Sequence, residues 1–305
     1  MNMQMRNLYK NTILIMFFSL CCSMAKGQTN IKIVRYDSII MYQRNIISQY
    51  EDLKGFSKLL SGIIIKNVEK DFSVEENLFR FYNSYKSLRK LYDDTQNIYT
   101  SKYRHELDSN MTIIDFSLER LYKIQPNIPK ADKIFLFISA LHENIIVYEN
   151  IIGIALDRYL GMDYYMYPKA MTKWKIQFSD IHRMPLDALK GYIVSHTPIQ
   201  TNKLLTNIDY LKYWANIYDI LSKVFEDYTE QEIFGFTDIQ YEWVKQNIDK
   251  IYKNAILKGD LDTYNQTIIE KYFGELPEDK VLPSEAPRQI GKYLAFWMLK
   301  TNKLK

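Results

Sequence analysis

Hydrophobic residues recur every three or four positions over most of the chain, which is the spacing that gathers them on one face of a helix. In the N-terminal half this spacing predicts helices from Tyr36 to about Tyr122. Gly55 is expected to break or cap the first of them, because glycine tolerates the left-handed conformation that ends many helices. Pro126 and Pro129 are expected to end the last one.

The same spacing returns after Pro185. The residues around Val194 are assigned to helix, and three further helices are predicted over 204–221, 238–254 and 288–300. Thr237 is a suitable N-cap for the second of these three, because its hydroxyl can accept a hydrogen bond from a backbone N–H of the first turn. A loop before the last helix is marked by Pro277, Pro283 and Pro287.

Two short apolar runs in the middle of the chain have a different character. Residues 133–139 and 150–157 are rich in β-forming residues, and a polar connector, 141–149, separates them. Short apolar runs on either side of a turn-sized gap are typical of paired strands. The sequence therefore predicts an α+β fold that is mostly helical, with helices packed on a small sheet formed by these two strands.

Composition places the chain among globular proteins. Hydrophobic residues make up 47% of it, and 10 Gly and 8 Pro are too few for a loop-rich sandwich. No composition shift marks a domain boundary, so residues 28–305 are expected to form a single domain. The 25 Tyr suit half-buried helix faces, and a partner surface is their alternative use. The net charge of +4 is small and dispersed, so no nucleic-acid partner is expected.

The beginning of the chain has the pattern of a secretory signal peptide. A basic start precedes the apolar run 13–22, which is too short for a membrane-spanning helix because such a helix needs roughly 20 apolar residues. The small residues Ala25 and Gly27 predict cleavage before Gln28, which makes residues 1–27 the signal peptide; cleavage after Ala25 is the alternative. We therefore expect an exported protein that is periplasmic or membrane-associated from the periplasmic side.

The two cysteines lie where a lipid-modified cysteine would lie. A lipobox has a small residue directly before its cysteine, whereas Cys21 follows Leu20 and Cys22 follows Cys21. The fit is poor, so a lipid anchor and a soluble periplasmic form both stay open. Cleavage after Cys22 leaves no cysteine in the mature chain, and disulfides then contribute nothing to its stability. No later segment is apolar for long enough to span a membrane.

The histidines give little support for a metal site. Zinc peptidases place two histidines at i and i+4 on one helix, with a glutamate next to the first as the base. His105 and His142 are each followed by glutamate, but Ser109 and Ile146 occupy the i+4 positions. Cysteine chemistry, the serine nucleophile elbow and the glycine-rich nucleotide loops are also missing. We therefore expect no metal and no cofactor.

The segment 157–161, Asp-Arg-Tyr-Leu-Gly, is the most distinctive local feature. It follows the second apolar run, places two opposite charges side by side and ends in glycine. Two interpretations stay open. Asp157 and Arg158 are an ion pair at a strand end with a turn glycine, or they are site residues at a strand terminus.

Three segments, in this order, resemble the GldB family, the gliding-motility lipoprotein B group of diderm bacteria. The first is I-I-G-I-A-L-D-R-Y-L-G over 151–161, followed by Asp163, Tyr164 and Tyr167. The second consists of Gly235, Phe236 and Thr237 with Tyr241, Glu242, Trp243 and Asn247. The third is A-P-R-Q-I-G over 286–291, followed by Phe296 and Trp297. The resemblance is strongest over 133–302, and the N-terminal half shares with the family only export and helix content.

This family is similar to zincin-like metallopeptidases, so the resemblance implies a zincin-like fold. In catalytic relatives one helix carries His-Glu-x-x-His and a later helix supplies a glutamate ligand. Here residues 196–200, H-T-P-I-Q, fall near the first of these helices, where threonine replaces the base, glutamine replaces the second histidine and Pro198 would disturb the helix. No glutamate lies over 213–218, where the later ligand is expected. The resemblance therefore implies that the zinc site has been lost.

From these observations we expect a non-catalytic cell-envelope protein that binds an envelope partner or assists an assembly. The resemblance adds attachment to the envelope near gliding or secretion machinery. The alternative is a metal-dependent hydrolase or peptidase with an atypical site, for which Asp157, Glu242 and His196 would have to lie together. A purely structural role is the third hypothesis. The candidate functional positions are Asp157, Arg158, His196, Tyr213, Glu242 and Arg288.

Overall fold

The computed structural model describes most of the chain, namely residues 31–66, 69–199, 206–257, 266–274 and 286–304. The expected signal peptide, both cysteines, Pro277 and Pro283 lie outside the described residues. Within the described ranges, none of the helices combines the length and the apolar character needed to cross a membrane.

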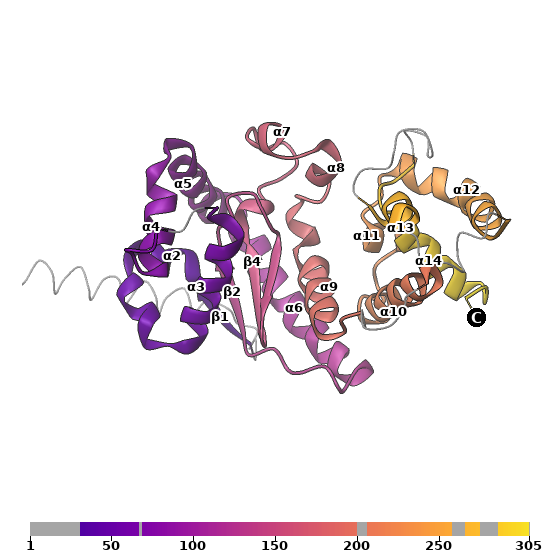
Figure 1. Cartoon of the computed structure of the whole chain (residues 1–305), viewed down its shortest axis with the longest axis horizontal. Helices are drawn as coiled ribbons and strands as arrows, with labels where there is room; N and C mark the ends of the chain where they lie inside the picture. The colour runs from indigo at the N-terminus through magenta and orange to yellow at the C-terminus, as the bar shows by residue number, and fades with distance from the viewer. Residues whose placement is uncertain (1–30, 67–68, 200–205, 258–265, 275–285, 305) are drawn as a thin grey trace, which may run out of the picture.

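A four-stranded sheet lies at the centre of the described molecule (Figure 1). Its strands follow the order β1 (Lys32–Arg35), β2 (Lys133–Phe137), β4 (Ile151–Ala155) and β3 (Ile145–Tyr148). Strands β1, β2 and β4 run parallel, and β3 pairs antiparallel with β4. The helix-rich architecture with a small mixed sheet confirms the predicted α+β class.

The sheet corrects two details of the prediction. The two predicted strands, 133–139 and 150–157, are neighbours but run parallel, because β3 lies between them in the sequence, within the segment assigned to a polar connector. A tight turn at Glu149 and Asn150 joins β3 to β4, and Glu149 adopts a φ of 49° there. Two-residue hairpins require such left-handed turn residues, and a glutamate in that position gave no signal.

Five helices connect β1 to β2, as the periodicity of the N-terminal half predicted. They are α2 (Tyr36–Tyr42), α3 (Glu51–Ile64), α4 (Val74–Ser84), α5 (Lys86–Ser101) and α6 (Arg104–Ile124), with a 3₁₀ turn over Arg44–Gln49. Helix α6 ends before Pro126, as expected. Gly55 does not end a helix, because it lies inside α3, where an added Cβ would be 2.1 Å from the Tyr148 hydroxyl oxygen. Its role is to let α3 approach β3 closely.

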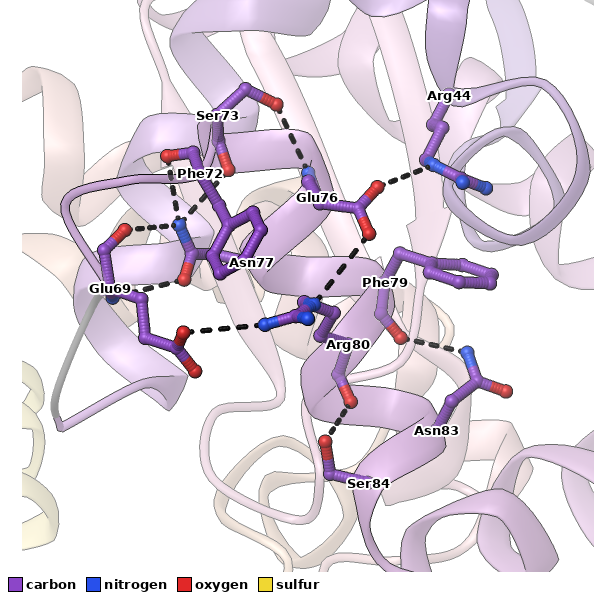
Figure 2. Close-up of polar contacts among 10 residues, drawn as sticks. All are labelled: Arg44, Glu69, Phe72, Ser73, Glu76, Asn77, Phe79, Arg80, Asn83 and Ser84. Carbon is purple, nitrogen blue, oxygen red and sulfur yellow. Dashed lines mark hydrogen bonds and ion pairs between the residues drawn. The ribbon is translucent and has the colours of Figure 1, made fainter.

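Figure 2 shows polar contacts along α4, among them those that hold its start. The Ser73 hydroxyl caps the helix by accepting a hydrogen bond from the Glu76 backbone N–H at 3.2 Å. The buried amide of Asn77 donates to the carbonyls of Glu69, Phe72 and Ser73 at 2.9–3.1 Å, which ties the preceding loop to the helix. The Glu76 carboxylate lies between the guanidinium groups of Arg44 and Arg80.

Helices cover the sheet from both sides (Figure 1). Helices α2 and α3 contact β2 and β3, and α9 (Met184–His196) contacts β3 and β4, with α6 packed against α9. The core between α3 and the sheet is aromatic: the Phe56 ring lies edge-on to the rings of Tyr36, Phe135 and Phe137. The short helices α7 (Tyr167–Ala170) and α8 (Lys173–Ile176) lie between β4 and α9 in the sequence, together with 3₁₀ turns over Leu156–Arg158 and Ile181–Arg183.

The C-terminal part is helical, as predicted. Its helices are α10 (Asn207–Val224), α11 (Glu230–Phe234), α12 (Asp238–Leu257), α13 (Gln266–Phe273) and α14 (Ile290–Lys300). The Thr237 hydroxyl accepts a hydrogen bond from the Gln240 backbone N–H at 3.3 Å, so this residue is the expected cap of α12. Helix α10 begins at Asn207, behind a capping box of Thr206 and Asp209, and residues 204 and 205 of its predicted span lie outside the described residues. It packs along α14.

Candidate functional site

A pocket of about 210 Å³ lies between the sheet end of the molecule and the C-terminal helices. The loop after β2, the turn after β4, helix α8 and the start of α9 line one side, and residues of α10, α11 and the segment 286–292 line the other. Among the described residues its wall is cationic, because two carboxylates, Glu143 and Asp187, stand against six basic side chains, namely Arg158, Lys175, Arg183, Lys190, Arg288 and Lys292.

The loop after β2 is fastened by the carboxylate of Asp157, which is fully buried at the end of β4. One carboxylate oxygen accepts the backbone N–H of Ser139 at 2.8 Å, and the other accepts that of Leu141 at 2.7 Å. Ala140 and Leu141 have φ values of 55° and 66°, a left-handed conformation that non-glycine residues adopt only at a cost. Burial raises the pKa of Asp157, against the lowering effect of these two N–H groups.

Arg158 is the next residue, and its side chain is directed to the pocket. It is 8% exposed. Nη1 donates to the Leu141 carbonyl at 2.9 Å and contacts the Met171 sulfur, whereas the buried Nε has no hydrogen-bond partner. Within the described part of the chain Arg158 forms no ion pair, so its neighbour Asp157 positions it indirectly, by shaping the loop whose carbonyl accepts its N–H.

A second buried carboxylate, Asp187, organises the α9 side of the pocket. It is 2% exposed, and Lys190 Nζ lies 2.9 Å and Arg183 Nη2 lies 3.5 Å from its Oδ1. Its Oδ2 accepts hydrogen bonds from the Tyr159 hydroxyl and the Asn144 amide, each at 3.2 Å. Burial would raise the pKa of Asp187, but Lys190 and Arg183 outweigh burial and hold this pKa below its usual value.

This depressed pKa predicts how stability depends on pH. Ionised Asp187 stabilises the folded state fully above the unfolded pKa of about 3.9, and this contribution is lost as pH falls through the lower folded pKa. We therefore expect the difference in free energy of unfolding between wild type and Asp187→Asn to shrink below about pH 4. Urea unfolding between about pH 2.5 and pH 7 measures it.

The matched control for this measurement is Asp108→Asn, at an exposed position on α6. Its unfolding at each pH separates the specific effect of Asp187 from the general loss of carboxylate charge on acidification. A difference between wild type and Asp187→Asn that stays constant down to about pH 2.5 would contradict the assigned ion pairs.

The C-terminal wall of the pocket combines cations with aromatic rings. Gln289 adopts a left-handed φ of 57° directly before α14, and its side-chain oxygen accepts a hydrogen bond from Lys292 Nζ at 2.6 Å. Arg288 precedes it and forms no ion pair with the described residues. Phe234 stacks on Tyr218 with ring centroids 4.1 Å apart. Both rings belong to the lining of the pocket.

The structure brings together only part of the set of candidate residues. Arg158 and Arg288 line the same pocket, and Asp157 shapes the loop beside it. Asp157 and Arg158 do not form the ion pair that one interpretation expected, although Gly161 is a turn glycine with a φ of 95°. Of the others, His196 lies at the end of α9, Tyr213 is half-buried on α10 and Glu242 is exposed on α12.

The three residues of the hydrolase hypothesis do not meet. The Nδ1 atom of His196 lies 3.0 Å from the Tyr192 carbonyl oxygen, and Glu242 pairs with Lys245. Asp157 is engaged with backbone N–H groups. Helix α9 ends at His196, so Thr197 and the following residues do not continue it. Among the described residues, no group of three or more His, Cys, Asp and Glu side chains is placed to hold a metal ion.

The residues of α9 that line the pocket were not identified from the sequence. Arg183 directly before α9, and Asp187 and Lys190 within it, stand at i, i+4 and i+7, a charged stripe on a helix that is otherwise largely buried. That stripe gave only a weak signal, because charges at this spacing are common on helices without a site. Trp174 and Lys175 gave no signal, because only the fold brings α8 to this site.

The chain matches the family described as Gliding motility protein GldB over residues 23–301. The match extends through the N-terminal half, beyond the region in which the resemblance was strongest. Neither the curated proteins nor the solved structures contain a match to the chain. The family assignment supports a place in the cell envelope, whereas the relation to zincins stays a prediction. Because the match covers most of its length, the chain belongs to the GldB family of gliding motility proteins.

Proposed function

We propose that the protein is a non-catalytic binding component of the gliding-associated cell envelope and that its cationic pocket receives an anionic group of an envelope partner. The observation that carries this proposal is the pair Arg158 and Arg288, which line one pocket without a carboxylate partner among the described residues. Withdrawing a guanidinium from water is costly unless an anion compensates it. A bound partner group supplies that anion, and bidentate arginine contacts give such binding its geometry.

The carboxylates near the pocket are poorly suited to catalysis. A general base needs a free oxygen within reach of the substrate proton. Both oxygens of Asp157 accept backbone N–H groups, and both oxygens of Asp187 are engaged by side chains. Glu143 is exposed beside His142 at the pocket, and it is therefore the carboxylate to test for the alternative, hydrolytic function.

The binding role predicts which variants lose function in the cell. In a strain that lacks the protein, the double variant Arg158→Gln and Arg288→Gln is expected to fail to restore colony spreading, although the wild type restores it. Removing both guanidinium groups removes the charges that hold the partner group. Immunoblots of the envelope fraction check that the variant accumulates. The matched control is Arg89→Gln, because Arg89 is only partly buried on α5, pairs with Asp93 there and does not line the pocket.

The same strain distinguishes the binding role from the hydrolase alternative. Glu143→Gln, His196→Ala and Glu242→Gln are expected to restore spreading as well as the wild type does. Loss of spreading in any of these three, together with stoichiometric metal in the purified protein, would contradict the non-catalytic role. Spreading that survives the double arginine variant would contradict the pocket as the binding site.

We also propose that residues 1–27 are removed on export and that the mature chain stays on the periplasmic side of a membrane. The apolar run and the small residues before Gln28 support this proposal. Mass spectrometry of the protein isolated from the envelope fraction tests it. A free N-terminus at Gln28 supports the soluble form, an acylated cysteine at 21 or 22 supports a lipid anchor, and an uncleaved chain would contradict export by this route.

A further inference from the structure

Several N–H groups of pocket residues are buried without a hydrogen-bond acceptor. In the described part of the chain, six buried side-chain nitrogen and oxygen atoms lack a hydrogen-bond partner, and three of them are N–H donors of pocket residues: Nε of Arg158, Nε of Arg183 and Nε1 of Trp174. Buried donors are almost always paired in folded proteins, because an unpaired one keeps its full desolvation cost. Three such donors around one cavity indicate that the acceptor is a ligand.

The charge of the pocket indicates how many negative charges that ligand carries. Six basic side chains and two carboxylates belong to the described lining, and two of the basic ones, Arg158 and Arg288, form no ion pair with the described residues. Asp187 already engages Arg183 and Lys190, so it leaves Arg158 and Arg288 uncompensated. A concave wall of one sign raises the local concentration of the opposite charge. A dianion with several acceptor oxygens matches this excess better than a single carboxylate does.

We propose that the pocket binds the phosphate monoester of an envelope sugar or lipid headgroup. This inference rests on the proposed binding function and names the chemistry of the ligand. The three terminal oxygens of a phosphate monoester can accept hydrogen bonds from Arg158, Arg183 and Trp174 together, and arginine forks bind phosphate in a bidentate manner. Because these three N–H atoms are buried, their side chains must turn toward the anion as it enters, and the anion then supplies the missing acceptor.

The aromatic part of the lining and the size of the pocket indicate what is attached to the phosphate. The rings of Trp174, Phe178 and Phe234 line it, and flat apolar surfaces of this kind suit the face of a sugar or a short stretch of lipid. The cavity of about 210 Å³ is smaller than the roughly 300 Å³ or more that encloses a drug-sized ligand. The pocket therefore takes the phosphate with its first attached group, and the rest of the partner stays outside.

Titration calorimetry of the purified protein tests this inference with defined probes. Inorganic phosphate and glucose 6-phosphate are expected to bind at low salt, and dimethyl phosphate, a singly charged diester, is expected to bind about tenfold more weakly or not at all, since each lost charge-assisted contact changes affinity by about that factor. Vesicles of phosphatidylcholine with phosphatidic acid, compared with phosphatidylcholine alone, test the lipid source. Binding of glucose 6-phosphate without binding of the phosphatidic acid vesicles assigns a sugar, and binding of the vesicles without binding of glucose 6-phosphate assigns a lipid.

The variants link the binding to the pocket. Arg158→Gln and, separately, Arg288→Gln are each expected to weaken phosphate binding about tenfold, whereas Arg89→Gln leaves it unchanged. Arg288 is only half-buried, so its variant serves if Arg158→Gln unfolds. No binding by any probe, equal affinity for dimethyl phosphate, or unchanged affinity in both pocket variants would overturn the inference. If the double arginine variant still abolishes colony spreading in that case, the binding function stands and its ligand has another chemistry.

Discussion

Replacement of Phe56 by alanine is expected to lower the free energy of unfolding by about 3–5 kcal/mol. The side chain is fully buried on α3, and its ring centroid lies 4.9 Å from that of Tyr36 and 5.1 Å from that of Phe135. Alanine loses the transfer free energy of the ring and leaves a cavity between α3 and the sheet, which rigid strands cannot fill by collapse. Equilibrium unfolding in urea, followed by far-UV circular dichroism, measures the loss.

The control for this variant is Phe116→Ala, because Phe116 is 63% exposed on α6 and its removal is expected to change stability by no more than about 0.5 kcal/mol. A second test uses Gly153 on β4, where an added Cβ would lie 2.6 Å from the Phe56 ring and 3.0 Å from the Ile146 carbonyl oxygen. Gly153→Ala alone is expected to cost about 1–3 kcal/mol through overpacking. Combined with Phe56→Ala it should cost less than the sum of the two. Strict additivity would contradict the packing described for this interface.

Replacement of Asp157 by alanine is expected to cost about 3 kcal/mol or more, since it leaves two buried N–H donors without an acceptor and each costs about 1–3 kcal/mol. These donors, the backbone N–H groups of Ser139 and Leu141, lie in the loop whose residues 140 and 141 hold left-handed conformations. Without the carboxylate nothing offsets that conformational cost. The burial that raises the pKa of Asp157 reduces the net gain from the carboxylate, but the variant does not recover the lost hydrogen bonds.

Ser139→Ala is the matched control in the same loop. Its hydroxyl lies 3.3 Å from both carboxylate oxygens of Asp157, and its removal keeps the stronger backbone N–H bond, so a loss of about 1 kcal/mol is expected. The folded fraction of Asp157→Ala should also bind phosphate more weakly, because the Leu141 carbonyl then no longer holds Nη1 of Arg158 in place. Equal stability of the two variants would contradict the role assigned to Asp157.

The sequence predicted the helices well where one face of each is buried. Periodicity identified the helical N-terminal half, α9, α10, α12 and α14, because tertiary packing there follows the same spacing. It missed β1, which has four residues and no alternation. It also missed β3, although Ile145–Tyr148 are β-forming residues, because this short run was assigned to the connector between the two predicted strands. Gly55 was misassigned because a glycine that ends a helix and one that admits a neighbouring ring look alike in one sequence.

The candidate site could be predicted only in part. Arg158 and Arg288 lie in distinctive segments, and both segments meet at the pocket. Arg183, Asp187 and Lys190 are spaced like an ordinary ion-pair stripe on a helix surface, which is common in proteins without a site. They line a pocket only because α8, α10 and α11 approach them in the folded chain, and one sequence does not show which helices meet in space. His196, Tyr213 and Glu242 were chosen because of the family motifs they resemble, and the fold does not bring these residues together in one site.

The parallel pairing of β1 with β2 has a consequence for the order of folding. All five helices from α2 to α6 lie between these two neighbouring strands, so their pairing closes a long loop. The chain loses the conformational entropy of this loop before the contacts within the sheet can stabilise it. A chain that emerges from its N-terminus can form α3 to α6 locally, but β1 stays without its neighbour until β2 has been made. We therefore expect formation of the sheet to be the slow step in folding, and the unpaired first strand to be the part of the nascent chain most exposed to wrong pairing.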